Sequence, residues 1–211
     1  MKVLDLFCCC GGVSKGFISA GHEVTGVDIT DNHEYPFDFI HSDVFKLKPE
    51  FFEKFDFIHA SPPCQQFSWS ARQWINKGYE FEPDLIDRTR QLLLKTGKLF
   101  SIENVVGAPV RKDLVLCGEM FGLRVLRHRI FETHGFTVLQ PLHVKHKPPI
   151  DRNHSYYVNL TGHGGQSYSF KLEDWHNAIG IDWITKKEHL TQAIPPAYTE
   201  YIGNYLPSPS K

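Results

Sequence analysis

Short apolar runs alternate with stretches of helical periodicity over the first hundred residues of the chain. The apolar runs predict five strands, over Lys2–Phe7, Glu23–Ile29, Phe39–His41, Asp56–Ala60 and Phe100–Glu103. The periodic stretches predict helices over Gly12–Ala20 and Pro83–Leu99. Strands that alternate with helices form a parallel sheet with helices on both faces. The pattern therefore predicts an α/β fold with a doubly wound, mostly parallel sheet.

The alternation weakens after about residue 110, and the elements predicted there are shorter. Arg124–Glu132 and Thr137–Leu139 have the character of two strands of a hairpin. Residues 140–171 contain clustered Pro, His, Gly, Ser and Tyr without periodicity, which predicts an irregular lobe. Thr185–Glu188 has the spacing of a capping box that begins a helix, and a last helix is predicted over Ala197–Leu206.

Ligands of such a sheet bind beyond the carboxyl ends of its strands. The first strand leads into Cys8–Gly12, a glycine-containing loop before a helix N-terminus, which suits a nucleotide-type ligand. The loop lacks the G-x-G-x-x-G pattern, so a dinucleotide fold is unsupported. Asp28 follows the second strand and could accept ribose hydroxyls, and Asp43 follows the third and could accept an adenine amino group. Each is equally compatible with an ordinary turn carboxylate.

The sharpest signal is Ser61–Ser68, which follows the fourth predicted strand. Two prolines stiffen the turn and present Cys64 at the edge of the sheet, a placement that a buried packing cysteine does not need. Thiolates are good nucleophiles and good leaving groups, which suits reversible covalent catalysis. Glu103 ends the neighbouring strand, and a protonated carboxyl group there could donate to a ring nitrogen if burial raises its pKa.

Composition and charge restrict the class of protein. A chain of 211 residues with 41% hydrophobic residues suits one domain, or one domain plus a lobe, and argues against disorder. No apolar run is long enough to span a membrane, Asp5 comes early for a signal peptide, and five cysteines make a poor disulfide framework. A cytoplasmic protein is expected. Residues 88–147 contain 11 basic and 4 acidic residues, which suits a polyanionic ligand or, alternatively, only a solvated face.

Five motifs resemble those of the C5-cytosine DNA methyltransferases, in the family's order and spacing. They are Asp5–Gly12, Pro62–Gln65, Glu103–Val105, Arg127–Arg129 and Ala193–Asn204. Each is weak alone, but together they cover nearly the whole chain. The resemblance implies a class I methyltransferase fold. It divides the chain into a catalytic and cofactor-binding domain (1–132), a reduced target-recognition lobe (133–171) and C-terminal helices that return to the catalytic domain (172–211).

The resemblance also implies a reaction, in which S-adenosylmethionine methylates C5 of a cytosine flipped out of duplex DNA. In this reaction Cys64 adds to C6, Glu103 holds N3, Arg129 contacts the cytosine and Arg127 supports it. The two arginines are also compatible with plain alternation on an exposed strand. The cofactor-binding residues expected from the family are Asp5, Phe7, Cys9, Gly11, Gly12, Asp28, Ile29, Asp43, Val44, Pro62 and Asn204.

Residues expected at the nucleic acid come from three regions. They are Pro63, Gln65, Ser68, Arg72, Asn104, Lys145, Lys147, Arg152 and Lys171. The loop over residues 65–82 resembles the flap that closes over DNA in the family, although a plain surface loop has the same composition. Three positions depart from the family: Cys9 replaces a glycine, Asp28 a glutamate and Val125 a glutamine.

The expected partner is double-stranded DNA, with a restriction endonuclease as a candidate second partner and a monomer as the expected state. Methylation of RNA, as in a transfer-RNA relative of the family, and a catalytically silent partner subunit are the alternatives. Intact Cys64, Glu103 and Arg129 argue against the silent subunit. No metal is expected, because His143, His146 and His154 have no acidic or cysteine cluster near them in the sequence.

Overall fold

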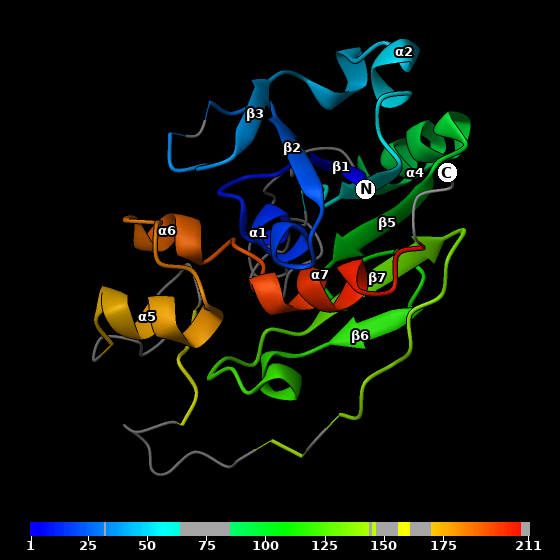
Figure 1. Cartoon of the computed structure of the whole chain (residues 1–211). Helices are drawn as coiled ribbons and strands as arrows, with labels where there is room; N and C mark the ends of the chain where they lie inside the picture. Colours follow the sequence, from blue (N-terminus) through cyan, green and yellow to red (C-terminus); the bar gives the residue numbers. More distant parts are fainter. Residues whose placement is uncertain (32, 64–84, 144, 147–155, 161–169, 208–211) are drawn as a thin grey trace, which may run out of the picture.

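The computed structural model describes residues 1–31, 33–63, 85–143, 145–146, 156–160 and 170–207 (Figure 1). The strands are β1 (Lys2–Leu6), β2 (Glu23–Asp28), β3 (Asp38–His41), β4 (Phe57–Ala60), β5 (Leu99–Asn104), β6 (Leu114–Leu116) and β7 (Arg129–His134). The helices are α1 (Gly12–Ser19), α2 (Pro49–Phe52), α4 (Leu85–Thr96), α5 (Leu172–Ile179), α6 (Lys187–Leu190) and α7 (Pro196–Gly203). Two short 3-10 helices are η1 (Val44–Lys46) and η3 (Gly118–Phe121).

The strands form one sheet in the order β3-β2-β1-β4-β5-β7-β6. Strands β1 to β5 pair in parallel, whereas β7 runs antiparallel to β5, and β6 antiparallel to β7. The chain crosses to the other side of β1 between β3 and β4, so the sheet has a topological switch point between β1 and β4. The predicted doubly wound, mostly parallel α/β fold is confirmed.

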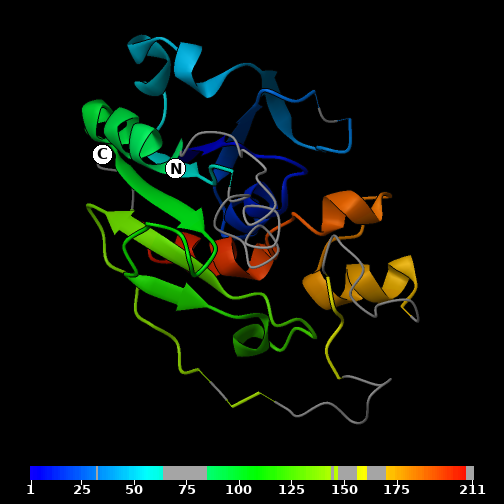
Figure 2. The ribbon, with the colours of Figure 1, turned by 180° about the vertical axis from the view of Figure 1, so that it is seen from behind.

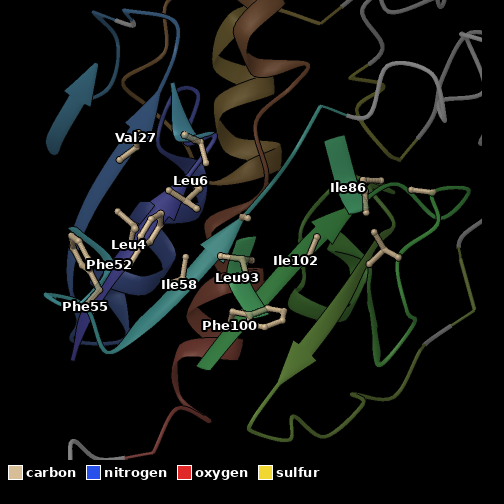
Figure 3. Packing of buried hydrophobic residues seen from close by; sticks show 14 of the residues in the cluster. Leu4, Leu6, Val27, Phe52, Phe55, Ile58, Ile86, Leu93, Phe100 and Ile102 are labelled. Carbon is tan, nitrogen blue, oxygen red and sulfur yellow. The ribbon is translucent and has the colours of Figure 1, made fainter. Parts of the chain in front are cut away.

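Helices cover both faces of the sheet (Figures 1 and 2). On one face, Leu4, Ile58 and Phe100 are buried in a cluster that includes Phe52 of α2 and Leu93 of α4 (Figure 3). Alternate strand residues point to the other face, where α1 and α7 lie side by side. These two helices approach closely at one glycine: a Cβ on Gly16 would lie 2.1 Å from the carbonyl oxygen of Pro196.

A third buried cluster lies outside the sheet and joins α5 and α6. Trp175 and Ile179 of α5 pack there with Leu190 of α6, and Cys10 of the first loop belongs to the same cluster. Figure 1 shows the two helices beyond α1, on the side away from β5. Helices α5 and α6 therefore pack in one cluster with the loop that follows β1.

Two expectations for the second half of the chain are wrong. Strand β7 overlaps the predicted strand Arg124–Glu132, but its hairpin partner is not Thr137–Leu139: it pairs with β6, which has only three residues and gives little pattern. The capping box at Thr185 does not form, because the Thr185 N–H and hydroxyl both donate to Glu34. Helix α5 lies within the segment 172–211 that was expected to contain C-terminal helices, although no bounds were predicted for it. Among the described residues, no helix is both long enough and apolar enough to cross a membrane.

Candidate active site

Many of the predicted site residues that the structure describes lie along one edge of the sheet. Strands β1, β2, β4 and β5 end at this edge, and β7 begins there because Asn104, the last residue of β5, pairs with Ile130. Arg129 therefore lies beside the end of β5, although it is far from Glu103 in the sequence. This antiparallel register supplies the edge with guanidinium groups that a wholly parallel sheet would have placed at the other end.

The loop after β1 is held in an unusual backbone conformation. Phe7, Cys9 and Gly11 all have positive φ values, of 60°, 46° and 83°. The Cys9 N–H donates to Asp28 Oδ2 at 2.9 Å, and the Thr30 N–H donates to Asp28 Oδ1 at 2.9 Å. Asp28 thus fastens the end of β2 to the loop. The neighbouring Ile29 side chain is 65% exposed at this edge, where an apolar ring could cover it.

Cys9 is strained at this position, because a side chain in the left-handed region costs on the order of 1 kcal/mol. We expect Cys9→Gly to raise the free energy of unfolding slightly, despite the greater flexibility of glycine in the unfolded chain. Cys8→Gly is the matched control: Cys8 is buried and has no positive φ, so its replacement destabilises. Urea titrations measure both. Equal destabilisation by the two changes would contradict this account of the loop.

Asp5 is a buried carboxyl group on β1 behind the loop. The Ser14 hydroxyl donates to Asp5 Oδ2 at 2.5 Å, and the Tyr35 hydroxyl lies 2.7 Å from the same Ser14 oxygen. The Oδ1 atom has no hydrogen-bond partner among the described residues. Burial raises the pKa of Asp5 from 3.8 to about 7, with the Ser14 hydrogen bond acting in the opposite direction. A ligand ammonium group would satisfy the open oxygen.

The raised pKa of Asp5 makes stability depend on pH. Between pH 4 and pH 7 the unfolded chain loses this proton while the folded chain keeps it, so ionisation favours unfolding as pH rises. From pH 5 to pH 8 the loss is about 3 kcal/mol. We expect Asp5→Asn to remove this part of the pH dependence and to be more stable than the parent at pH 8. Denaturant titrations at both pH values measure it, and an unchanged slope in the variant would contradict the assignment.

Glu103 is the second buried carboxyl group, and it lies at the carboxyl end of β5. Its Oε1 atom is 2.8 Å from Arg129 Nε, and only 5% of the residue is exposed. Burial raises the pKa of Glu103 above the ordinary value, although Arg129 and Arg127 act to lower it. The carboxyl group therefore keeps a proton to higher pH than an exposed glutamate does. A protonated carboxyl group can donate a hydrogen bond to a ring nitrogen.

A chain of buried polar side chains supports Glu103 from within the sheet. Ser61 hydrogen-bonds to Glu103, and the Ser61 hydroxyl lies 3.0 Å from His59 Nε2. His59 Nδ1 lies 2.7 Å from the Ser101 hydroxyl. Burial lowers the pKa of His59 to about 3, so the ring is neutral. His59 and Ser101 were not among the residues expected from the sequence. Each is a polar residue inside an apolar strand, and that was the available signal of a buried polar contact.

Arg127 is positioned by the C-terminal segment, and Arg129 by its own strand and by Glu103. Arg127 Nη2 donates to the carbonyl oxygen of Thr191, and the Tyr198 hydroxyl of α7 donates to the Arg127 carbonyl oxygen at 2.6 Å. Arg129 Nη1 donates to the His128 carbonyl oxygen at 2.9 Å. Tyr198 is completely buried and was another residue that the motif-based analysis missed. Both arginines therefore sit in fixed orientations beside Glu103.

Asn104 fixes the start of the segment that leads to Cys64. Its Nδ2 atom donates to the Pro62 carbonyl oxygen at 3.0 Å, and its Oδ1 atom accepts from the Val105 N–H at 3.0 Å. Pro62 is buried and Pro63 is exposed. Asn104 is thus a positioning residue here, rather than one shown at a substrate. The remaining predicted residues of the segment and of the lobe lie outside the described residues: Cys64, Gln65, Ser68, Arg72, Lys147 and Arg152.

Other predicted cofactor residues have structural tasks. Asp43 Oδ1 accepts from the Phe45 N–H at 2.9 Å and so caps η1, while the Val44 side chain is buried in the core. Gly12 makes room for the returning chain, because a Cβ there would lie 2.3 Å from the carbonyl oxygen of Ile194. Lys145 and Lys171 are both exposed, as phosphate contacts require.

Asn204 is misplaced by the sequence analysis. It follows the C-terminal end of α7, where the Gly203 carbonyl oxygen lies 3.0 Å from His22 Nε2, just before β2 begins. This is the opposite edge of the sheet from the loop after β1. Residues 193–196, at the N-terminal end of α7, are the part of the C-terminal motif that meets the loop.

Comparisons with known proteins give first the class and then the family. The Entamoeba histolytica methyltransferase EhMeth has the same fold, with a TM-score of 0.65 and 12% identity over 97% of each chain. A Spodoptera frugiperda DNMT2 structure matches 62% of this chain and 48% of its own, with 23% identity and a TM-score of 0.45. The EhMeth match shows a shared fold over nearly the whole of both chains.

The family model described as C-5 cytosine-specific DNA methylase matches residues 1–113, which is more than half of the chain. The chain belongs to this family. The Type II methyltransferase M.NgoPII of Neisseria gonorrhoeae is 36% identical over 118 residues, which are 51% of this chain and 34% of that protein. The chain thus matches about a third of the length of this relative.

Proposed function

We propose that the chain is an S-adenosylmethionine-dependent DNA cytosine C5-methyltransferase that acts through Cys64. The observation that carries the proposal is the buried Glu103, whose carboxyl group has a raised pKa and lies 2.8 Å from Arg129 Nε. The Pro62–Pro63 turn, which leads directly to Cys64, is tied to the same strand by Asn104. Family membership supports the reaction class, transfer of a methyl group to C5 of cytosine.

The residues around the edge have complementary tasks in this reaction. The Cys64 thiolate bonds to C6 of the cytosine, and the electron pair displaced from the ring double bond makes C5 nucleophilic. Glu103 donates its proton to N3 and so relieves the charge that develops on the ring. After the methyl group is in place, a base removes the C5 proton, the ring double bond reforms and the thiolate leaves. Arg129 orients Glu103 and contacts the flipped base.

The residues around the loop after β1 fit S-adenosylmethionine. Asp5 Oδ1 is a buried oxygen without a partner among the described residues, which suits the ligand's ammonium group. Asp28 offers carboxylate oxygens for ribose hydroxyls, although both now accept backbone N–H groups, and exposed Ile29 suits the adenine ring. Phe7, Cys9 and Gly11 shape the backbone between them. When bound, the cofactor supplies an electrophilic methyl group.

The proposal also includes the nucleic-acid substrate, which we take to be duplex DNA. Duplex DNA is favoured by the family to which the chain belongs and by exposed lysines such as Lys145 and Lys171. The M.NgoPII relative is named a Type II methyltransferase, so a restriction endonuclease is the second partner that we propose. We further propose that the chain works as a monomer in the cytoplasm.

A competition experiment distinguishes DNA from RNA. Purified protein with methyl-labelled S-adenosylmethionine is given duplex DNA and transfer RNA at equal concentrations of cytosine. We expect label in 5-methylcytosine of the DNA, with the RNA unlabelled. Label only in the RNA would replace the DNA proposal by the RNA alternative. The Glu103→Gln protein is the control, because it shows how much label is transferred when the Glu103 carboxyl group is absent.

A further inference from the structure

One cysteine and three histidines converge beside the proposed active site without any task in it. They are Cys117, His128, His143 and His146, and one ligand atom from each lies within 4.8 Å of all the others. Cys117 follows the end of β6, and His128 precedes the start of β7. The pairing of β6 with β7 sets these two side by side, since Leu116 is opposite Arg129.

The histidine nitrogens already have the separation that a metal ion imposes. His128 Nε2 lies 3.1 Å from His143 Nε2 and 3.3 Å from His146 Nε2. A tetrahedral zinc ion with Zn–N distances of about 2.0–2.1 Å separates two nitrogen ligands by roughly 3.3 Å. Two imidazole nitrogens can form a hydrogen bond at this distance, but three that face one another fit a common cation better.

The remaining ligands complete a known type of coordination shell. Cys117 is completely buried and forms no disulfide, so its sulfur is available as a fourth ligand once a metal replaces the thiol proton. His146 Nδ1 lies 2.7 Å from Glu119 Oε2, which leaves Nε2 directed at the cluster. A carboxylate behind a ligating histidine is the usual support of a zinc ligand.

We propose that Cys117, His128, His143 and His146 bind one zinc ion. Three nitrogens and one thiolate fill a tetrahedral shell, so the site has no open position for substrate and is structural. Binding displaces the thiol proton to solvent, and the three imidazoles bind as neutral ligands. The sequence-based expectation of no metal considered only neighbours in the sequence, whereas the β6–β7 pairing sets Cys117 beside His128, and both lie close to His143 and His146.

The position of the site explains what the ion would stabilise. His128 lies between Arg127 and Arg129, the residues that face Glu103, and His143 and His146 belong to the segment that leaves β7 for the lobe. One ion therefore fastens the end of β6, the start of β7 and the first part of the lobe to one another.

Metal analysis of untagged protein tests the proposal. Protein from zinc-supplemented cells is dialysed and measured by inductively coupled plasma mass spectrometry. We expect about one zinc ion per chain, lost in Cys117→Ser and in His143→Ala. His143 is exposed, so His143→Ala keeps the fold, which circular dichroism checks. His33→Ala, another exposed histidine, and Cys64→Ser, another cysteine, are the matched controls and keep the zinc.

A cobalt-loaded sample identifies the ligands. Tetrahedral cobalt with one thiolate ligand gives visible ligand-field bands and a sulfur-to-metal charge-transfer band in the near ultraviolet. We expect both in the parent and in Cys64→Ser, and loss of the charge-transfer band in Cys117→Ser. The proposal is overturned if the folded parent binds no more metal than Cys117→Ser, or if Cys64→Ser is the variant that loses it. The first of these results would leave the proposal of methyl transfer by Cys64 untouched.

Discussion

Replacement of Cys64 by alanine is expected to abolish methyl transfer completely. In the proposed mechanism the Cys64 thiolate is the group that bonds to C6, so its loss removes the covalent step. DNA that carries 5-fluorocytosine at the target traps the bond, because fluorine cannot leave as a proton does. We therefore expect the parent protein to form a stable adduct that resists denaturation and is visible as a shift on a denaturing gel, and Cys64→Ala to form none.

Cys8→Ala is the control for this experiment, since Cys8 is buried and its sulfur is not available to a base. It should form the adduct as the parent does. An adduct with Cys64→Ala, or the loss of the adduct in Cys8→Ala alone, would contradict the assignment of the nucleophile.

Replacement of Glu103 by glutamine is expected to have the next largest effect. Glutamine keeps the size of the side chain but cannot give a proton to N3. Hydrogen bonds made to charge that develops in the transition state are worth about 3 kcal/mol, so kcat should fall by roughly 10²- to 10³-fold. The affinity for S-adenosylmethionine should change far less. Single-turnover rates and equilibrium binding separate the two.

The pH profile provides a second test of Glu103. Because burial raises the pKa of this carboxyl group, the proton that it donates is present at low pH and is lost as the pH rises through the pKa. The parent rate should therefore decline on the alkaline side, and the residual rate of Glu103→Gln should lack that decline. Equal rates of parent and variant would show that another group holds N3.

The parallel half of the fold was predictable because its signals are local. Each of the strands β1 to β5 is an apolar run with a break on either side, and five of them lie within one hundred residues. The edge pair β6 and β7 was not predictable in the same way. Leu114–Leu116 is too short to show a period, and its position depends on pairing with a strand that comes 13 residues after Leu116.

The residues of the candidate site also fall into two groups: those that local sequence signals predict, and those whose contacts depend on strand pairing. Glu103 and the Pro62–Pro63 turn follow strands whose ends could be placed from the sequence, so their proximity could be expected. The ion pair of Glu103 with Arg129 depends on the antiparallel register of β5 with β7, which no local pattern shows. The Asp28–Cys9 hydrogen bond and the proximity of Cys117 to His128 also join residues that are apart in the sequence, so no local pattern shows them. Asn204 was misplaced because a motif does not show which end of its helix faces the ligand.

The central claim is methylation of cytosine C5 in DNA, and sequencing of converted plasmid DNA tests it most directly. Plasmid is recovered from cells that lack other cytosine methyltransferases and express either the parent chain or Cys64→Ala. After bisulfite treatment, we expect cytosines that resist conversion in the parent sample, all within one short recurring sequence, and none in the Cys64→Ala sample. The contrary result is that the parent protein is soluble in the cells, yet every cytosine of their plasmid is converted, as in the Cys64→Ala sample. That result would contradict the account.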